Sequence, residues 1–532
     1  MFAKIVDLAQ LPDSMPLYSA AECREIDRRA IEDEGISGIV LMKRAARAAF
    51  TSLLERWPNV DGIIVFCGSG NNAGDGYLMA SLAAEKTIPT TVVLLAEPNK
   101  LKGDAKLAFE HVLGINAAAK GSDPGSKNSD PIQILSLETL DETPIRENTV
   151  VVDALLGTGI SGSPKANFLS AIEWINHSPL PVLSVDIPSG LNADTGDDHS
   201  GGRSGDKSNA VKADLTVSFV GLKRGLFTAK GPGLIGDIEF SDLGIPAHIV
   251  NSQLPSARLL NLPECLAALP DRSLDSHKGD FGHVLVIGGD HGFGGAAMMA
   301  AEAAARVGAG LVTLATREEH CLSMLARRPE IMVKGVESTN DLVVLIEKAT
   351  TIVIGPGLGQ SEWSKQLFKL AIKSALPLMI DADALNLLSE QGDSFASKQN
   401  NWILSPHPGE ASRLLNMGIS EVQSDRFASV ANLQARFQCV SLLKGRGTLI
   451  ADGKNPIAVA NVGNPGMASG GMGDILSGVI GGLLAQGLDL ASAASLGVML
   501  HGVAADRAAQ KDGQRGMLAT DLLPYLRQLV NR

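Results

Sequence analysis

A glycine-rich segment late in the chain, Asn464–Asp474, combines two features that phosphoryl transfer requires. It contains four glycines and ends in Asp474, where an apolar pattern predicts a helix over Asp474–Leu484. Small residues let a phosphate approach the backbone, and the N–H groups and dipole of a helix start attract an anion. A carboxylate there repels anions unless it handles protons, so we interpret Asp474 as a base for an attacking hydroxyl. The alternative is a helix N-cap after a flexible loop, and the density of glycine favours function.

A second glycine-rich segment, Gly68–Gly76, follows a predicted strand and opens a predicted helix. This context is typical of a nucleotide diphosphate bound at a helix N-terminus. Its first residues satisfy a loose Gly-x-Gly-x-x-Ala pattern, which alone is weak evidence for a dinucleotide site. Asn71, Asn72 and Asp75 are unusual in a purely structural turn, although asparagine and aspartate accept turn geometry. We therefore expect this segment to bind a ligand.

Two further predicted strands of the first half end in polar side chains. Asp153 precedes a glycine loop at Gly157–Gly159, and Asp186 precedes Ser189. The carboxyl ends of parallel strands line the ligand crevice, so these side chains and Asn72 could converge. The set offers oxygen ligands without His or Cys, which suits a hard cation. If Asp186 does proton chemistry, one carboxylate remains, which favours a monovalent ion. Each aspartate taken singly could instead be a cap or a turn former.

Four segments of the second half could contact a nucleotide. Two are glycine loops after predicted strands, and neither has the Lys-Ser/Thr ending of a P-loop. A third holds His407 between two prolines, whose fixed φ angles aim it at a ligand or at a helix cap. The fourth ends a strand with two cations and two glycines, which could bracket phosphates or form a plain hairpin turn. In chain order they are Gly288–Ala296, Gly355–Gly359, Ser405–Glu410 and Leu443–Thr448.

In the first half of the chain, the predicted elements that must position these residues alternate between helix and strand. A capping box at Ser19–Glu22 starts a helix to about Glu34, and further helices are predicted over 39–57, 76–86 and 104–113. Hydrophilic stretches at 120–130 and 196–209 predict surface loops. Short β-branched runs predict strands at Gly62–Cys67, Thr90–Ala96, Thr149–Ala154, Pro181–Asp186, Ala213–Val220 and Leu234–Phe240.

The second half repeats this rhythm, so both halves predict α/β domains with mostly parallel sheets. Mixed composition around 251–270 predicts the boundary, with domains at 1–250 and 259–532. A small hairpin is expected at 448–451 and 457–460, and helices at 474–484, 491–509 and 520–530. The predicted strands are His283–Gly288, Gly310–Thr316, Thr351–Gly355, Pro377–Asp381, Asn401–Ser405 and Val440–Lys444.

Composition narrows the class of protein. At 532 residues the chain is too long for one core, and 45% hydrophobic with 20% charged residues is typical of soluble globular proteins. The net charge of −12 argues against a nucleic-acid partner. Five scattered cysteines indicate a reducing compartment and no zinc site. We expect neither a secretory signal nor a membrane span, and hence a cytoplasmic protein with small-molecule substrates.

The motifs of the first half together resemble the NAD(P)H-hydrate epimerase family. The resemblance rests on Gly70–Gly76, Asp153–Gly159 and Asp186–Leu191, with Ala213–Val217 and Lys223–Leu226 also similar. The family usually has a second glycine where this chain has Ala73, which is a mild departure. The resemblance implies that residues 1–250 form a Rossmann-like three-layer sandwich that interconverts the R and S forms of hydrated NADH and NADPH.

The resemblance also implies roles for residues. Asn72, Asp153 and Ser189 would hold a potassium ion, and Asp186 would be the acid–base catalyst, because epimerisation moves a proton at the hydrated carbon. The hydrated nucleotide would contact Asn71, Asn72, Ala73, Gly74, Asp75, Gly157, Thr158, Gly159, Ile160, Ser161, Gly162, Ser163 and Asp186.

The second half is similar to the ribokinase-like, ADP- or ATP-dependent NAD(P)H-hydrate dehydratases along almost its whole length. The combination of His277–Gly279, Gly355–Gly359, His407–Glu410 and Gly470–Asp474 carries this resemblance. The whole chain therefore resembles bifunctional bacterial repair enzymes that join both activities. The two-domain form implies ADP as the donor, although no residue distinguishes ADP from ATP, and family likeness hints at a homo-oligomer.

The implied chemistry turns a poor leaving group into a good one: the ring hydroxyl is phosphorylated and phosphate is then eliminated. Asp474 would take the hydroxyl proton while backbone N–H groups of Gly471–Gly473 stabilise the transferring charge. Magnesium would accompany the nucleotide. The adenine nucleotide would contact Lys444, Gly445, Arg446, Gly447, Thr448 and Gly473, and the hydrated cofactor would contact Ala296, Gly359, His407 and Asp474.

Three other hypotheses share parts of this evidence. A vitamin or sugar kinase fused to a dinucleotide-binding domain would use the same Asp474 chemistry but release a phosphorylated product. A non-enzymatic nucleotide sensor would need binding alone. A Rossmann dehydrogenase fits less well, because the Asn71–Asn72 pair and the missing hydride-transfer partner domain do not suit it.

Overall fold

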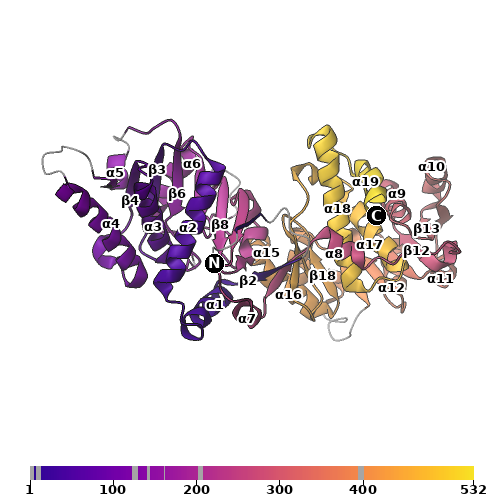
Figure 1. Cartoon of the computed structure of the whole chain (residues 1–532). Coiled ribbons are helices and arrows are strands. Elements are labelled where there is room, and N and C mark those ends of the chain that lie inside the picture. Colours follow the sequence, from indigo (N-terminus) through magenta and orange to yellow (C-terminus); the bar gives the residue numbers. More distant parts are fainter. Residues whose placement is uncertain are drawn as a thin grey trace. The chain divides into compact units, whose positions relative to one another are not determined.

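The computed structural model describes residues 5–7, 14–122, 130–140, 144–160, 162–201, 208–392 and 401–531. The chain forms two compact units, and the change from one to the other falls between Ala257 and Arg258 (Figure 1). Each unit has its own sheet and its own hydrophobic core. Among the described residues, no helix combines the length and apolar character needed to cross a bilayer.

The first unit is built on an eight-stranded sheet in which all neighbours are parallel except β1 and β10. In spatial order its strands are β1 (Ile5–Asp7), β10 (Asp237–Ser241), β8 (Leu215–Phe219), β7 (Val182–Val185), β6 (Thr149–Ala154), β3 (Gly62–Cys67), β4 (Thr90–Leu94) and β5 (Ile132–Leu135). Strand β2 (Met15–Tyr18) pairs in parallel with β9 (Leu222–Lys223), outside this eight-stranded sheet, and the pairing places Tyr18 opposite Lys223.

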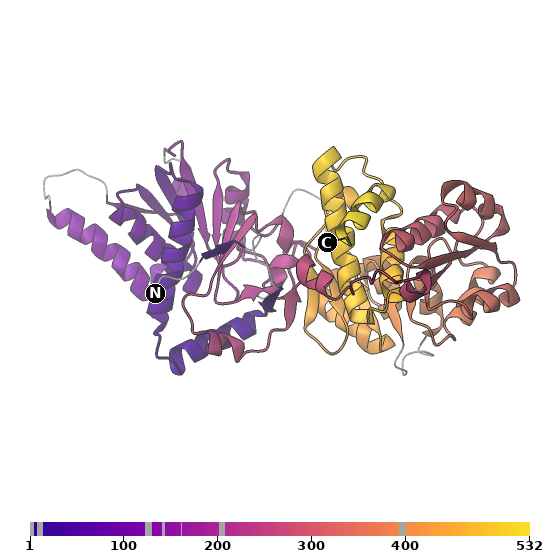
Figure 2. The same cartoon turned by 45° about the vertical axis from the view of Figure 1, so that its right-hand side comes forward.

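Helices cover both faces of this sheet, so the unit has three layers (Figures 1 and 2). Along β3, Ile63 and Val65 join the core under the first helices, whereas Ile64 and Phe66 join a second core with α6. This alternation follows from the two-residue period of a strand. The helices are α1 (Ala20–Glu32), α2 (Gly38–Arg56), α3 (Asn71–Glu85), α4 (Gly103–Ser122), α5 (Leu137–Leu140), α6 (Ala166–His177) and α7 (Ala247–Asn251).

The second unit has a parallel sheet that ends in an antiparallel hairpin. Its strand order is β14 (Met332–Gly335), β13 (Leu311–Thr316), β12 (His283–Ile287), β15 (Thr351–Ile354), β16 (Leu378–Ile380), β17 (Trp402–Leu404), β18 (Val440–Leu443), β19 (Thr448–Ala451) and β20 (Ile457–Ala460). The predicted α/β class and the predicted hairpin are confirmed.

On one face of that sheet, α9 (Gly294–Arg306), α17 (Met472–Ala485), α18 (Leu490–Asp512) and α19 (Leu523–Leu529) share one core. Helices α9 and α17 approach so closely that a methyl group on Gly478 would lie 2.0 Å from the Ala300 carbonyl oxygen. The remaining helices are α8 (Leu262–Ala267), α10 (Cys321–Arg327), α11 (Thr339–Ile346), α12 (Glu362–Ala371), α13 (Ala382–Glu390), α14 (Pro408–Leu415), α15 (Ile419–Ser424) and α16 (Arg426–Phe437).

Several predicted boundaries were wrong. The helix predicted over 76–86 begins at Asn71, and the helix expected from Asp474 begins at Met472. The strand expected at 234–240 lies at Asp237–Ser241. Helix α4 continues to Ser122 into the loop predicted at 120–130, of which residues 123–129 lie outside the described part, as do 202–207 of the loop predicted at 196–209. The helix expected over 520–530 is a 3₁₀ turn, Ala519–Leu522, followed by α19.

Candidate active sites

Asn72, Asp153 and Ser189 come together at the carboxyl ends of β3, β6 and β7. Ser189 Oγ lies 2.5 Å from Asp153 Oδ1 and 3.1 Å from the Leu156 carbonyl oxygen. Asn72 Nδ2 donates to the same Leu156 carbonyl at 3.2 Å. The structure thus brings together three residues that the sequence places far apart, and Leu156 is a member of the group that the sequence analysis missed.

The polar surroundings of these residues suit a cation. Asp153 is fully buried, and its carboxylate accepts hydrogen bonds from Ser184 Oγ and from the side chain and N–H of Ser189. Burial raises the pKa of Asp153, and the hydrogen bonds from Ser189 and Ser184 oppose that rise. The buried Asn72 Oδ1 has no hydrogen-bond partner among the described residues. One carboxylate, neutral oxygens and an unused acceptor fit a singly charged hard cation.

Asp186 occupies an unusual backbone conformation beside this group. Its φ of 68° lies in the left-handed region, and its N–H donates to the Val217 carbonyl at 2.8 Å. Its carboxylate forms an ion pair with Lys223 and accepts from the Phe219 N–H at 3.1 Å. Side-chain and backbone contacts therefore hold a conformation that aspartate rarely adopts, which is a common property of functional sites.

Lys223 is the cation at the centre of a cluster of acidic side chains. Its side chain is 2% exposed, and Nζ donates to the Phe219 carbonyl at 2.8 Å as well as to Asp186. Burial raises the pKa of Asp27 to about 6, against the effect of Lys223. Burial, with Asp186 and Asp27, raises the pKa of Asp75 well above its usual range. Burial thus favours the protonated form of Asp75, next to the ion-paired carboxylate of Asp186.

The other residues predicted to contact the hydrated nucleotide lie on two segments. Asn71 is exposed in the first turn of α3, whereas Ala73 and Gly74 are buried and their N–H groups point back to the Gly70 carbonyl. Gly157 lies beside Asn72, because a methyl group on it would be 3.4 Å from Asn72 Cβ. The half-buried or exposed residues of the loop after β6 are Gly157, Thr158, Gly159, Ile160, Gly162 and Ser163, and Ser161 lies outside the described residues.

In the second unit, Asp474 lies half-buried in the first turn of α17. Burial and the carboxylates of Asp381 and Asp383 together raise its pKa to about 7, against the opposing effect of Lys444. A pKa near neutrality suits a general base. Asp381 and Asp383 were not predicted as site residues, although Asp381 ends a predicted strand and Asp383 lies two residues after it.

Asp381 and Lys444 form a buried ion pair next to Asp474. Asp381 is 1% exposed and accepts from Lys444 Nζ at 2.7 Å and from Ser477 Oγ at 2.6 Å. A methyl group on Gly473 would be 3.5 Å from both Asp381 Oδ2 and Lys444 Nζ. Gly473 thus leaves the ammonium group accessible at the start of α17, where an anion is attracted by charge and by the helix dipole.

His407 is both a helix cap and an exposed group. Its Nδ1 accepts from the Gly409 N–H at 3.0 Å at the start of α14, and about half of the side chain is exposed. Its Nε2 lies 3.4 Å from Glu410, whose pKa is raised to about 7 by burial and Asp381 against the effect of Lys444. Burial and Lys444 lower the pKa of His407, so it is neutral at physiological pH. The two readings left open by the sequence, cap and ligand contact, are compatible.

The glycine loops of this unit bring further carboxylates together. The Gly359 N–H donates to Asp383 at 2.9 Å, and a methyl group on Gly359 would be 3.1 Å from Asp290. Asp290 accepts from Arg317 Nε at 2.9 Å and from Ser361 Oγ at 2.7 Å. The neighbouring Gly357 lies beside Ala296, with 3.1 Å between the two Cβ positions. Asp290, Asp383 and Arg317 were not predicted as site residues.

The segment predicted to bind phosphates, Lys444–Thr448, is the turn of the β18–β19 hairpin. The guanidinium group of Arg426 is buried beneath it and donates to the carbonyls of Leu443 at 3.0 Å and Lys444 at 3.3 Å. Gly445 and Arg446 are exposed, and Thr448 Oγ1 donates to the Gly445 carbonyl at 3.0 Å. Arg426 therefore fixes the shape of a loop whose outer side is open.

Comparison with known proteins agrees with this division into two sites. Residues 38–225 match the family model described as YjeF-related protein N-terminus, and residues 284–528 match the one described as NAD(P)H-hydrate dehydratase. The bifunctional NAD(P)H-hydrate repair enzyme of Coxiella burnetii is 48% identical over 97% of this chain and 99% of its own length. The enzyme of the same name from Escherichia coli is 39% identical over 98% and 95%.

Solved structures resemble the second half. The ADP/ATP-dependent NAD(P)H-hydrate dehydratase from Bacillus subtilis, co-crystallised with ATP and Mg²⁺, is 30% identical to this chain. The match covers 51% of this chain and 96% of that protein, with a TM-score of 0.45.

Proposed function

The chain belongs to the family of bifunctional NAD(P)H-hydrate repair enzymes, and from that premise we propose which residues perform each reaction. The first unit is the epimerase and the second the dehydratase. The observation that carries the assignment for the dehydratase is the position of Asp474, with a pKa raised to about 7, beside the Lys444–Asp381 ion pair at a helix start. That arrangement combines a base with a phosphate-binding cation.

In the dehydratase, Asp474 takes the proton from the ring hydroxyl of the S-hydrate as the hydroxyl oxygen attacks the terminal phosphorus of ADP. The bond from that phosphorus to the bridging oxygen breaks and AMP leaves. The resulting phosphate ester then departs as inorganic phosphate while a ring C–H proton is lost, which restores the double bond of the dihydropyridine. Lys444 and the N–H groups of Gly471–Gly473 stabilise the charge on the transferred phosphoryl group.

The remaining predicted residues complete this site. The turn Lys444–Thr448 and Gly473 hold the adenine nucleotide, and Ala296, Gly359 and His407 contact the hydrated cofactor. Among the described residues no three His, Cys, Asp or Glu side chains gather as a metal cluster. Mg²⁺ would be carried by the phosphates of the nucleotide, as in many phosphoryl-transfer sites, and would neutralise part of their charge.

In the epimerase, Asp186 moves the proton at the hydrated carbon, and the ion pair with Lys223 fixes the position of its carboxylate. Support comes from the left-handed backbone of Asp186 and its ion pair with the buried Lys223. Asn72, Asp153 and Ser189 would hold K⁺, which would supply a positive charge next to the substrate. The unused Asn72 Oδ1 supports that assignment. The hydrated nucleotide lies against the start of α3 and the loop after β6.

One incubation separates repair from the rival activities. Hydrated NADH, ADP and Mg²⁺ with this protein should regenerate the absorbance of reduced nicotinamide and release AMP and phosphate in equal amounts. A vitamin or sugar kinase would leave that absorbance unchanged. Asp474→Asn should reduce turnover by roughly 10²–10⁴-fold, the usual contribution of a general base, while ADP binding persists. Wild-type turnover in the D474N variant would refute the assignment.

A further inference from the structure

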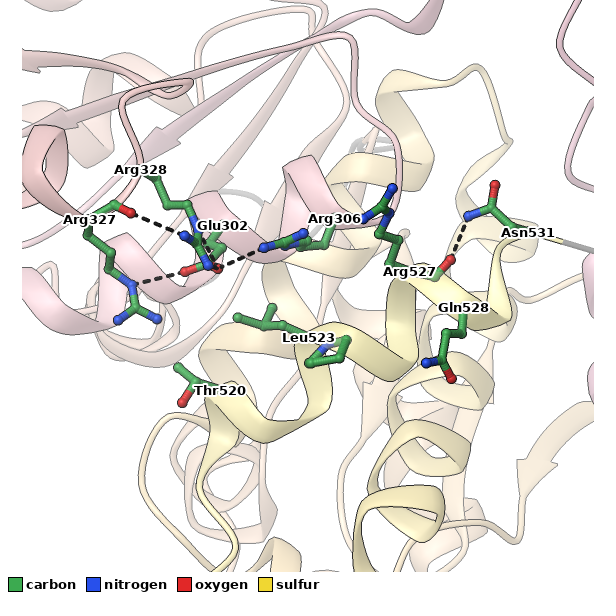
Figure 3. Close-up of a pocket in the computed structure, with 10 residues that line it drawn as sticks. Glu302, Arg306, Arg327, Arg328, Thr520, Leu523, Arg527, Gln528 and Asn531 are labelled. Atoms are coloured by element: carbon green, nitrogen blue, oxygen red, sulfur yellow. Dashed lines mark hydrogen bonds and ion pairs between the residues drawn. The ribbon is translucent and has the colours of Figure 1, made fainter. Parts of the chain in front are cut away.

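A pocket of about 490 Å³ lies in the second unit between α9, the end of α10 and α19, and most of its charged lining is arginine (Figure 3). Arg306 comes from the last turn of α9, Arg327 and Arg328 from the end of α10, and Arg527 from α19. The acidic residue of the lining is Glu302 on α9. The lining therefore has a surplus of three positive charges, in a chain whose net charge is −12.

The bonding within the pocket shows which arginines the fold itself requires. Glu302 is 1% exposed and accepts from Arg327 Nε at 2.9 Å and from Arg328 Nε at 2.6 Å. A buried carboxylate needs such partners, and these two satisfy both of its oxygens. Figure 3 shows the guanidinium groups of Arg306, Arg327 and Arg328 turned toward Glu302, but Arg306 lies 3.9 Å from it.

Two guanidinium groups are left without a close acidic partner. Arg306 has only its distant contact with Glu302, and no described carboxylate forms an ion pair with Arg527. Like charges held together in a hollow repel one another, and a bound anion offsets that repulsion. The side chains of Arg306, Arg327 and Arg328 are 34–42% exposed, so a ligand can reach them.

We propose that this pocket binds a small anion with two or more phosphate groups, at a site separate from both catalytic centres. Guanidinium groups bind phosphate through paired N–H donors, and the three surplus charges match a diphosphate. The side chain of Gln528 on the same wall adds a neutral donor. The volume lies within the range of small-molecule sites, so inorganic pyrophosphate and an adenine nucleotide both fit.

The site is distinct from the nucleotide site proposed above because it lies at the other end of α9. Ala296 is in the first turn of that helix, whereas Glu302 and Arg306 are in its later turns. At a rise of 1.5 Å per residue, Ala296 and Arg306 are separated by roughly 15 Å along the helix axis. Removing Arg306 and Arg527 should therefore leave the dehydration rate unchanged in the absence of the anion.

Calorimetric titration of the full-length protein with pyrophosphate tests the proposal. The variant R306Q/R527Q removes the two arginines that Glu302 does not require, and K369Q/K373Q removes two exposed lysines elsewhere as the matched control. Wild type and control should share a pyrophosphate site that is at least about tenfold weaker in R306Q/R527Q, because two charge-assisted contacts are lost. Equal binding in all three proteins, or none in the wild type, overturns the proposal.

Titration with ADP distinguishes the two sources of the diphosphate. A second equivalent of ADP that R306Q/R527Q loses identifies an adenine nucleotide as the ligand. A single equivalent of ADP in both proteins, together with the pyrophosphate site in the wild type, identifies inorganic diphosphate.

Glu302→Gln gives an independent test by thermal unfolding. The substitution leaves Arg327 and Arg328 without their carboxylate, so the unliganded variant should unfold at a lower temperature than the wild type. Pyrophosphate can then pair with all four arginines, and it should raise the unfolding temperature of E302Q by more than that of the wild type. An equal or smaller rise in E302Q contradicts the proposal.

Discussion

At the scale of single residues, the two aspartates proposed as catalysts have different surroundings: Asp186 follows strand β7 and Asp474 lies in the first turn of α17. Asp474 has the carboxylates of Asp381 and Asp383 nearby, and burial with these charges raises its pKa to about 7. Asp186 instead contacts an ammonium group directly, that of Lys223. The surroundings, rather than the residue type, fit Asp474 for accepting a proton in a phosphoryl transfer and fix Asp186 in one orientation.

The raised pKa of Asp474 predicts the pH dependence of dehydration. The base must be deprotonated, so kcat/KM should rise about tenfold per pH unit below pH 7 and level off above it. Asp381→Asn removes a neighbouring negative charge and should move the midpoint to lower pH. Glu410 also has a pKa of about 7, so Glu410→Gln is the control: the midpoint should stay near 7. A midpoint that disappears in E410Q would assign the titration to Glu410 instead.

Lys223 offers a second test at this scale. Lys223→Met should lower the epimerisation rate by about 100-fold, at the low end of acid–base contributions, because Asp186 loses its ion pair. Exchange of the R and S hydrates by NMR measures that rate. Lys212→Met, at an exposed position, is the control and should epimerise normally. Dehydration of the pure S-hydrate should be unchanged in K223M. Loss of both activities would indicate misfolding, and normal epimerisation would exclude a role for Lys223.

At the scale of elements, the sequence predicted strands better than helix starts. Buried runs such as Gly62–Cys67 and Thr149–Ala154 coincide with β3 and β6, because β-branched residues and flanking turns mark them. Helix α3 starts at Asn71 although its first turns hold two glycines and two asparagines. Tertiary contact offsets their low helix propensity, since Gly76 packs so closely on β3 and β6 that a methyl group would be 2.7 Å from Ala154 Cβ.

The candidate sites were predictable to the extent that chemistry lies in short motifs. Asp474 and Ser189 stand next to glycines, Asp153 lies four residues before Gly157, and such motifs are visible in a single sequence. Asp381 and Lys223 act through partners 63 and 37 residues away, at distances that only the fold determines. Lys223 begins a segment that resembles the epimerase family and Asp381 ends a predicted strand, but neither pattern identifies the partner of the charge.

Helix α16 supports the turn proposed to bind the nucleotide, Lys444–Thr448, through Arg426. We therefore predict that a substitution of Arg426 weakens ADP binding although this residue does not contact the ligand. Arg426→Gln should leave carbonyls of Leu443 and Lys444 unsatisfied, which costs about 1–3 kcal/mol of unfolding free energy. It should also raise KM for ADP, by about tenfold, more than it lowers kcat. The control is Arg436→Gln, which lies on the same helix as Arg426 and removes a contact with the Leu414 carbonyl. It should reduce stability and leave KM unchanged; an equal KM increase in both variants would attribute the defect to general loosening.

At the scale of the whole molecule, each unit contains a complete polar site at the carboxyl ends of its own parallel strands. In each site an aspartate that directly follows a strand forms an ion pair with a lysine. The pairs are Asp186 with Lys223 and Asp381 with Lys444. The residues proposed for either reaction all come from one unit. If these assignments hold, we expect each reaction to need only its own unit, so that R-hydrate converted at the first site must reach the second site to be repaired.

This separation predicts that two full-length variants complement each other when each of them lacks one of the two activities. With an equilibrium mixture of R and S hydrates, Asp186→Asn should repair the S fraction quickly and then slow to the spontaneous rate of epimerisation. Asp474→Asn should repair nothing, yet it should still exchange the R and S forms with each other. Equal amounts of the two variants, mixed, should convert the whole mixture at a rate proportional to the D474N concentration once the S-hydrate is consumed. If repair by the mixed variants stops at the same extent as repair by D186N alone, the hydrate is not exchanged through solution. The epimerase must then act on substrate held within the same chain.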